Sequence, residues 1–496
     1  MDYIMGIDLG TTGCKASLFD REGRLAAQAY REYSQETYTG TIDCRQVWEK
    51  TQEVIRECNQ KHPQTRALCI TSFGESVVPV DRQGNPLGES ILYTAGGVDR
   101  EFRDLVDKAG YQRIYRITGH IPHPMYTVNR LIWYKDQQAE TYEAADCFLF
   151  FSSYIAMCLG ADRVAEDTHA ARSMAYEVQK GCWSQEILDA AGLDRGLLPP
   201  VVAAGERIGR VSEKMARELG FQDQPCVALG IGAIHGGDAV YGLGTVECLS
   251  VVLDQYQQSP AMEQSHLVCA PHVLPGKYLT YGVLYSGGNV IRELRERLFR
   301  PRLGREEGDI YQVMFRDLDQ IENPLTLVPH LFGSGTPSMR QKEGARIQGL
   351  RSDTTDRQIL QATLEGLAFD MKLNIENMEA ASIPVRSIRT AGGGAKSREA
   401  LQIRADALGQ SLYVPQDVQA GARGVFFIAA RALGWIGDYE EILHYIEGRG
   451  PAKAAGGILV EPRPELAARY RRKYAAYRHL LDQMEEDGQS ADHCPD

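Results

Sequence analysis

The chain has 496 residues, of which 43% are hydrophobic and 24% charged, so we expect a soluble globular protein with two large domains. Its net charge of −12 and its lack of basic runs argue against nucleic acid or an anionic membrane as main partners. It has no run of about eighteen apolar residues, no signal peptide and no CxxC pair among its eleven cysteines, which predicts a cytoplasmic protein with free thiols.

The N-terminal segment predicts consecutive antiparallel hairpins. Strand-like residues at 3–7, 14–20 and 25–30 are separated by the turns DLGTTG and REGR. A shift of 234 residues lays DLGTTGCKASLFD over GLGTVECLSVVLD, with five identities in thirteen positions. Chance can produce this match between two glycine-bearing hairpins. A hairpin that recurs half a chain apart nevertheless favours two similarly built domains.

Helical and strand patterns alternate downstream. We expect a helix over 47–60, a strand over 67–74 and a hairpin over 77–93 around Gln83-Gly84-Asn85. The strongest helical pattern covers 353–382, with apolar residues at three- and four-residue spacing and Asp353 or Thr354 as its cap. Residues 387–409 predict a strand, a glycine turn and a helix. A last amphipathic helix should follow Pro464.

The turn DLGTTG has the features of a phosphate-binding turn. Its backbone N–H groups and the hydroxyls of Thr11 and Thr12 can surround a phosphate. Asp8 ends the preceding strand and is placed to hold a hydrated magnesium ion, which prefers one or two carboxylates plus water and phosphate. Lys15 can add positive charge. A plain glycine-threonine hairpin is the alternative interpretation of a single such turn.

Two further glycine segments change that balance. The turn with Gly244 and Thr245 repeats the first one, and two such turns facing each other would form a two-sided phosphate clamp. AGGGAKS, at 391–397, follows a strand and begins a helix, so its glycines permit close backbone approach to a flat ligand and its helix start offers free N–H groups. Alone, this segment is as well explained as a structural turn. All three motifs in this order are far more specific.

With these motifs, the chain resembles the FGGY family of carbohydrate kinases, nearer its xylulokinase-like members than its glycerol kinases. The likeness covers nearly the full length and includes SFGESVVPVDRQGNPLGESILYT, GTVE, LVPHLFGSGTPSM, EGLAFDM, AGGGAKS and AGARGVFFIAARALG. The resemblance implies an α/β fold of two actin-like (ribonuclease H-like) ATPase domains with an interdomain nucleotide cleft. It also implies transfer of the γ-phosphate of ATP, with Mg²⁺, to a hydroxyl of a ketose or polyol. A homodimer would be unsurprising.

The resemblance also assigns domains and residues. It implies an N-terminal sugar-binding domain (1–235), a C-terminal nucleotide-binding domain (236–455), a C-terminal helix (456–486) and a disordered tail (487–496). The metal would be held by Asp8. The phosphates would face Thr11, Thr12, Lys15, Gly244 and Thr245, the adenosine would lie along Gly392, Gly393, Gly394 and Ser397, and the sugar-contacting loop would contain Gly74, Glu75 and Ser76.

The segment GIGAIHGGDAVYGLGTVE, at 230–247, departs from the family pattern. The family's aspartate that accepts the proton of the acceptor hydroxyl precedes the Gly-Thr turn by about twenty residues, whereas Asp238 lies six residues before Gly244. An ungapped overlay puts Asp238 in the loop that leads into the second domain. It indicates that about ten residues, including the base, are missing before Gly230. His235 and Asp238 are candidates for a displaced base, although a loop aspartate is more often a turn former.

Other positions near the substrate also differ. Relatives carry an aspartate directly after YT and an arginine soon after, whereas this chain has Ala95 and Gly97, and Asp99 with Arg100 either restores an acid–base pair or starts the next helix. Arg340 replaces a usually acidic residue. Two functions therefore remain open: a sugar kinase that relies on positioning and metal electrostatics, and a nucleotide-binding pseudokinase with a regulatory or scaffolding role. A damaged reading frame would also explain the missing segment, and the sugar is not identified.

Overall fold

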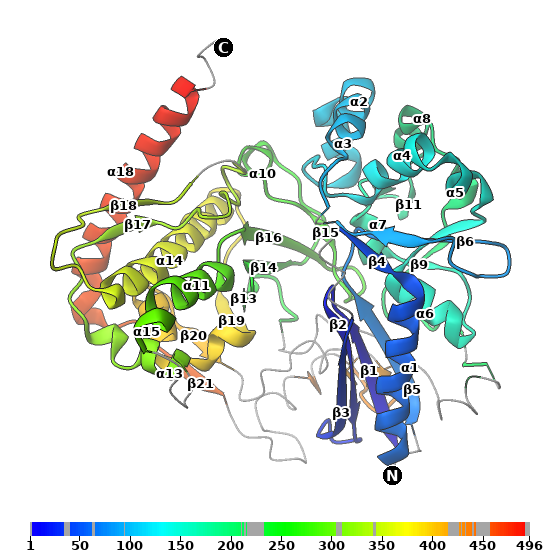
Figure 1. Ribbon diagram of the computed structural model, residues 1–496, viewed down its shortest axis with the longest axis horizontal. Coiled ribbons are helices and arrows are strands. Elements are labelled where there is room, and N and C mark those ends of the chain that lie inside the picture. The colour runs from blue at the N-terminus through cyan, green and yellow to red at the C-terminus, as the bar shows by residue number, and fades with distance from the viewer. Residues whose placement is uncertain are drawn as a thin grey trace.

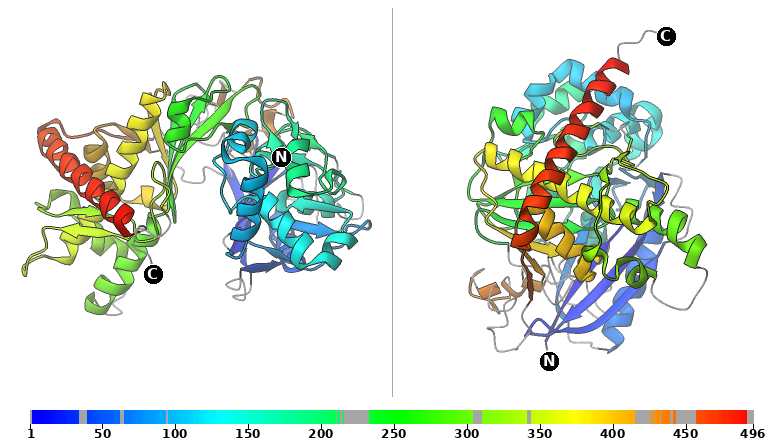
Figure 2. Two further views of the ribbon diagram at one scale, coloured as in Figure 1. Left: turned by 90° about the horizontal axis from the view of Figure 1, so that it is seen from above. Right: turned by 90° about the vertical axis from the view of Figure 1, so that its left-hand side faces the viewer.

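The chain folds into two α/β lobes that lie side by side (Figures 1 and 2). The computed structural model describes residues 2–33, 40–61, 65–93, 95–209, 211–212, 215, 233–303, 310–340, 344–414, 426–427, 429–431, 433–438, 441–442 and 457–491. None of the helices in these ranges is both long and apolar enough to cross a membrane.

The first lobe contains a four-stranded sheet, four two-stranded sheets and several short helices. Its elements are β1 (Tyr3–Leu9), β2 (Gly13–Phe19), β3 (Leu25–Glu32), β4 (Thr41–Asp43), α1 (Cys44–Lys61), β5 (Thr65–Ser72), β6 (Val77–Val80), β7 (Glu89–Ile91), α2 (Asp99–Ala109), α3 (Tyr111–Thr118), α4 (Thr127–Gln137), α5 (Ala139–Ala144), β8 (Cys147–Phe150), α6 (Phe151–Leu159), β9 (Ala165–Glu166), α7 (Asp167–Ala171), β10 (Tyr176–Glu177), β11 (Cys182–Trp183), α8 (Gln185–Ala191), η2 (Arg195–Leu197) and β12 (Val201–Val202).

The second lobe is built on a seven-stranded sheet crossed by a long helix. Its elements are β13 (Asp238–Leu243), β14 (Glu247–Leu253), α10 (Pro260–Gln264), β15 (Ala270–Pro271), β16 (Tyr278–Leu284), α11 (Gly288–Leu294), η4 (Arg295–Phe299), α12 (Arg300–Leu303), α13 (Ile310–Phe315), η5 (Leu318–Gln320), β17 (Thr326–Val328), β18 (Arg346–Gln348), α14 (Asp356–Ala380), β19 (Ser387–Ala391), η6 (Gly393–Lys396), α15 (Arg398–Leu408), β20 (Leu412–Val414), β21 (Ile458–Val460), η7 (Pro464–Leu466) and α18 (Ala467–Ala491).

The two main sheets repeat one topology. In the first, β3, β2 and β1 are antiparallel neighbours and β5 joins β1 in parallel. In the second, β16, β14 and β13 are antiparallel and β19 joins β13 in parallel. In each lobe the parallel strand follows a long helix, α1 or α14. The predicted hairpins and the predicted internal repeat are therefore confirmed.

The register differs between the two hairpins by one residue. Leu9 pairs with Cys14, whereas its counterpart Leu243 pairs with Glu247, because the second turn is one residue shorter. The ungapped overlay of Cys14 on Cys248 is therefore wrong by one position after the turn. The repeat lies in the strand order and pairing, which tolerate a change in turn length, rather than in those matched cysteines.

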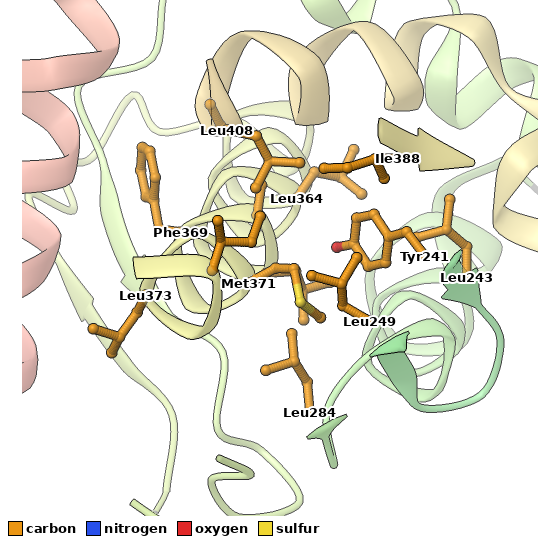
Figure 3. Packing of buried hydrophobic residues seen from close by; sticks show 14 of the residues in the cluster. Tyr241, Leu243, Leu249, Leu284, Leu364, Phe369, Met371, Leu373, Ile388 and Leu408 are labelled. Carbon is orange, nitrogen blue, oxygen red and sulfur yellow. The ribbon is translucent and has the colours of Figure 1, made fainter. Parts of the chain in front are cut away.

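The core of the second lobe explains the pattern of its long helix. Leu364 and Met371 of α14 are fully buried and share one cluster with Leu249 of the sheet (Figure 3). Each such side chain removed from water stabilises the fold by roughly 1.5–3 kcal/mol. The N-cap is Thr355 rather than Asp353 or Thr354, because Thr355 and Gln358 satisfy each other's backbone N–H groups in a capping box.

Two local predictions need correction. The chain reverses around Gly84, with Asp81 and Leu87 bonded to Asn85 and Pro79. β6 and β7 stay in contact through the Ser90 hydroxyl, which donates to the Val77 carbonyl, but each pairs with another strand, β8 or β4. The segment predicted as a helix from 456 first supplies β21 to the sheet.

The final helix α18 lies along the outer side of the second lobe (Figure 1) and is longer than predicted. Its Tyr470, Tyr474 and Tyr477 pack around Phe369 of α14, which fixes one face of the helix. The helix continues to Ala491, so residues 487–491 of the predicted tail are helical. Asp487 forms an exposed ion pair with Arg346 of β18 at 2.7 Å. The rest of the tail lies outside the described residues.

Candidate active site

The carboxyl ends of the parallel strand pairs bring the predicted site residues together within each lobe. In the first lobe, Asp8 pairs with Thr71, and the chain after β5 continues into the loop with Gly74 and Glu75. The backbone N–H of Phe73 donates to the carbonyl of Leu9 at 3.1 Å, which ties this loop to the end of β1. Parallel pairing thus places the predicted metal and sugar segments side by side.

The first turn presents polar groups at the end of β1. Thr12 is exposed and Thr11 half-buried, and the turn closes through a Gly10 N–H bond to the carbonyl of Gly13 at 2.9 Å. Asp8 keeps 46% of its side chain exposed, with the Lys15 ammonium 3.8 Å away. Partial burial raises the pKa of Asp8, and Lys15 acts against that shift. A single hard carboxylate beside open backbone N–H groups fits a magnesium ion that keeps water and phosphate as its other ligands.

The second turn is exposed and is held from behind by a helix. Gly244 and Thr245 accept hydrogen bonds through their carbonyls from the N–H groups of Gly288 and Asn289, both at 3.0 Å. A Cβ on Gly288 would lie 2.6 Å from the Gly244 carbonyl oxygen, so only glycine permits this approach. Helix α11 therefore fixes the turn while leaving its outer side open.

The glycine segment after β19 packs directly on the end of β13. Gly392 has φ of +97° and its added Cβ would meet the Leu243 carbonyl oxygen at 2.7 Å, while Gly394 approaches the Leu243 side chain. Gly393 is exposed, and nothing lies within 4 Å of where its Cβ would be. Ser397 caps α15 by accepting the N–H of Ala400. Parallel pairing of β13 with β19 thus joins the turn at 244–245 and this segment into one surface.

A buried ionic cluster lies beneath that surface. Glu247, the first residue after the second turn, accepts hydrogen bonds from Arg404 of α15 and from the hydroxyl of Tyr241. The side chains of Glu247 and Arg404 are each only 1% exposed. Burial disfavours the charged guanidinium, but Glu247 outweighs this effect and raises the pKa of Arg404. The cluster ties the turn to the helix that follows the glycine segment.

The predicted sugar loop has a charged side chain held in a strained position. Glu75 has φ of +58° and is 3% exposed, and its carboxylate accepts a hydrogen bond from Arg172, the residue after α7. Its carbonyl accepts the Thr127 hydroxyl at 2.8 Å. Ser76 is buried and its hydroxyl accepts the backbone N–H of Tyr93 at 2.9 Å, so it supports the loop from inside. A non-glycine residue at positive φ is typical of functional sites.

Arg172 connects this loop to the second lobe. Its guanidinium also donates to the hydroxyl of Tyr281 on β16, and it lies 5.5 Å from the ring centre of Tyr126 and 5.7 Å from that of Tyr281. Burial disfavours its charge, yet Glu75 outweighs this effect and raises the pKa of Arg172. Burial also raises the pKa of Tyr126 and of Tyr281, which keeps both hydroxyls neutral.

These residues border a cavity of about 360 Å³ at the junction of the two lobes. Its lining comes from β5 and the sugar loop, from α6 and α7, from the loop after β12, and from β15 and β16. Glu75, Arg172 and Tyr281 contribute its central polar groups, and Glu166 and His169 contribute a second charged pair. The volume suits a small polar molecule.

Arg172 and Tyr281 were not predicted from the sequence. Their contact joins residues 109 positions apart on different lobes, and no local pattern marks such a pair. The run EDTHAARS around Arg172 concentrates charged and imidazole groups in a short helix, which is the one signal that the sequence offered.

The structure does not bring Asp99 to this cavity. It begins α2, is exposed, and is absent from the described residues that line the cavity. Arg130 is buried and donates to the carbonyls of Leu92, Tyr93 and Met125, so it holds the chain at residues 92–93 in place. The geometry thus favours the helix-start interpretation of Asp99.

Asp238 also occupies a structural position. It begins β13, at the opposite end of the strand from the turn at Gly244. Its carboxylate accepts the N–H groups of Ile234 and His235 at 3.2 and 2.9 Å and the Ser387 hydroxyl at 2.8 Å. These bonds support the turn-former interpretation over the displaced base. The predicted gap before Gly230 lies outside the described residues.

Comparison with known proteins decides the family. The description "FGGY family of carbohydrate kinases" applies to two matches, an N-terminal domain over residues 3–240 and a C-terminal domain over residues 239–433. The chain belongs to the FGGY family of carbohydrate kinases.

The matches between this FGGY kinase and its relatives cover most of both chains. It is 24% identical to a xylulose kinase of Staphylococcus xylosus, with 89% of this chain and 93% of the relative covered. It is 25% identical to a glycerol kinase of Lactobacillus acidophilus, over 89% and 92% of the two chains. The solved xylulose kinase of Lactobacillus acidophilus matches with a TM-score of 0.86 at 23% identity, over 98% and 99%. The predicted two-domain α/β fold is therefore confirmed.

Proposed function

We propose that the chain transfers the γ-phosphoryl group of ATP to a hydroxyl of a small ketose or polyol bound in the cavity between the lobes. The observation that carries the proposal is the shared strand end in the first lobe. Asp8, the candidate metal ligand, pairs with Thr71, and Thr71 itself lines the cavity that contains Glu75 and Arg172. A phosphate turn and a polyol-sized cavity thus adjoin along one sheet edge.

The chemistry of the cavity suits a polyhydroxylated molecule. Glu75 and Arg172 together offer acceptor oxygens and donor N–H groups from a neutralised pair, which can bind adjacent hydroxyls without requiring a charged ligand. The relatives named above act on xylulose and glycerol, which are uncharged polyols of this kind. A ketopentose such as xylulose is the substrate that we favour.

The nucleotide is assigned to the second lobe and to the first turn. The exposed turn at Gly244 and Thr245 and the first turn at Thr11 and Thr12 supply backbone N–H groups for phosphates, and Lys15 adds charge. The open Gly393 in its glycine segment leaves room for the adenosine. Asp8 would hold magnesium, which neutralises charge on the phosphates when bound.

The remaining step is removal of the proton from the acceptor hydroxyl. One oxygen of Asp238 accepts backbone bonds within its own loop and the other accepts the Ser387 hydroxyl of β19, so we assign it no role in that step. Phosphoryl transfer depends mostly on positioning and electrostatic stabilisation, so turnover does not require a strong base. The pseudokinase alternative gains no support from the relatives, which are named as kinases.

The proposal is tested with pure protein, MgATP and a panel of ketopentoses and polyols. We expect ADP release that depends on one or more of the sugars, together with ATP binding measured by calorimetry. A matched Glu75→Gln variant, which keeps the shape of the side chain, should bind ATP normally and lose the sugar response. ATP binding without any sugar-dependent ADP release would contradict the proposal and favour the pseudokinase.

A further inference from the structure

His169 of α7 lies between the cavity and the end of β5. Its side chain is 12% exposed, lines the cavity and stacks on Phe150 with ring centres 5.3 Å apart. Its Nδ1 lies 2.6 Å from a carboxylate oxygen of Glu166, three residues earlier. Its Nε2 lies 3.2 Å from the backbone carbonyl oxygen of Ser72. The imidazole therefore has an acceptor-only oxygen on each side.

This arrangement selects the protonated imidazole. A neutral imidazole carries one N–H and can donate to only one of two acceptors, whereas the imidazolium donates to both. Glu166 is itself fixed, because its carboxylate also accepts the backbone N–H groups of Thr168 and His169 at 2.9 Å. The Ser152 hydroxyl, 3.2 Å from Nδ1, can turn to accept as well. The surroundings thus stabilise a positive charge at His169.

The carbonyl that His169 contacts begins the sugar loop. Ser72 is followed by Phe73, whose N–H is bonded to the end of β1, and then by Gly74 and Glu75. The Cδ2 of His169 lies 3.7 Å from where a Gly74 Cβ would be, so the ring also packs against the loop. The position of the Glu75 carboxylate therefore depends on a loop anchored at its start by one ionisable side chain.

We propose that His169, held as an imidazolium by Glu166, is a positioning residue for the sugar loop, so that sugar affinity falls when His169 loses its proton. This inference rests on the proposed function only in taking a sugar as the ligand of the cavity. His169 donates to the Ser72 carbonyl and has no assigned contact with the reacting atoms.

The charges around His169 set the direction of the pH effect. Burial lowers the pKa of His169, but the Glu166 carboxylate, the Ser72 carbonyl and the more distant Glu75 outweigh it, and the pKa lies above the ordinary value of 6.5. The positioning is therefore present at low pH and is lost as pH rises through this raised pKa. Arg172 is the cation on the same side of the cavity, and it stays charged throughout. Asp167, on the same helix, has its pKa raised to about 6 by burial and by Glu166, so measurements should begin above that value.

The test measures the dissociation constant of D-xylulose by calorimetry, and KM and kcat by ADP release, from about pH 7 to pH 9.5. For the wild-type protein we expect the dissociation constant and KM to rise, by up to about tenfold per pH unit above the pKa of His169, with kcat nearly constant. His169→Gln keeps a donor for the Ser72 carbonyl but does not titrate, so its profile should be flat. Glu166→Gln should move the rise to lower pH. The control His479→Gln, which removes an exposed imidazole on α18, should behave as wild type.

A pH-independent wild-type affinity, or a His169→Gln variant that keeps the wild-type profile, would overturn the inference. Hydrogen exchange of the segment 72–76 without ligand gives a second readout, corrected for the intrinsic rate at each pH. We expect its protection to fall at high pH in the wild type and to be independent of pH in His169→Gln. If no sugar binds at any pH, the proposed function fails, and the exchange result alone then supports or refutes the anchoring by His169.

Discussion

Removing the guanidinium of Arg404 should destabilise the second lobe strongly. Arg404→Met leaves the carboxylate of Glu247, which is 1% exposed, without its cationic partner. Loss of one partner from a buried ion pair costs about 3–5 kcal/mol. The Tyr241 hydroxyl still donates to Glu247, so we expect a value near the lower end of that range. The double variant Glu247→Gln with Arg404→Met should recover much of the loss, because no buried charge is then unpaired.

Native-state hydrogen exchange of β13 and β14 is the suitable assay, because a two-lobed chain has no single free energy of unfolding. A loss of about 3–5 kcal/mol corresponds to exchange that is faster by roughly two to four orders of magnitude in these strands. As a matched control, Arg113→Met breaks an ion pair with Glu186 whose side chains are 55% and 50% exposed, and it should change nothing resolvable. The reasoning would be refuted if these strands exchanged in Arg404→Met at a rate within tenfold of wild type. It would also be refuted if they exchanged as fast in the double variant as in the single one.

The other predictions concern the site itself. Arg172→Lys should raise the KM for the sugar by about tenfold to a hundredfold, from the ~1.5–3 kcal/mol of a lost charged hydrogen bond, while an unchanged KM would remove Arg172 from the sugar site. Gly392→Ala should impair ATP binding and lower the unfolding temperature, because its Cβ would meet the backbone of β13 at 2.7 Å, whereas Gly393→Ala should leave the unfolding temperature unchanged. Asp8→Asn should abolish magnesium-dependent turnover but keep metal-free ATP binding in calorimetry, and equal turnover would exclude Asp8 as the metal ligand. Asp238→Ala should lower stability with little change in kcat, and a loss of turnover in a fully folded variant would identify Asp238 as the base.

The sequence predicted those parts of the fold that depend on local pattern. The antiparallel hairpins, the long helix α14 and the glycine turns follow from residue spacing, and all are present. Errors occurred where tertiary pairing decides the outcome. In the segment 77–93, β6 and β7 pair with β8 and β4 rather than with each other, and these partners are distant in the sequence. Helix α18 continues to Ala491, beyond the predicted boundary.

The site shows the same division. Asp8 and the glycine segments were predicted from strand-and-turn motifs, and Glu75 was predicted from the resemblance to the family. Arg172 and Tyr281 were missed because their contact crosses from one lobe to the other, and only the folded chain brings them together. Asp238 shows the converse, since its Gly-Gly-Asp setting resembles a catalytic segment while its hydrogen bonds close the loop before β13 and join it to the start of β19.

The most direct test of the account is ³¹P NMR of a reaction that contains the protein, MgATP and D-xylulose, because it separates phosphoryl transfer from ATP hydrolysis. We predict a phosphate-ester resonance on the sugar that grows in proportion to ADP, and that is absent without the sugar and in Glu75→Gln. ADP that accumulates only with inorganic phosphate, or no ADP under conditions where ATP and the sugar both bind, would contradict the proposal that this chain is a sugar kinase.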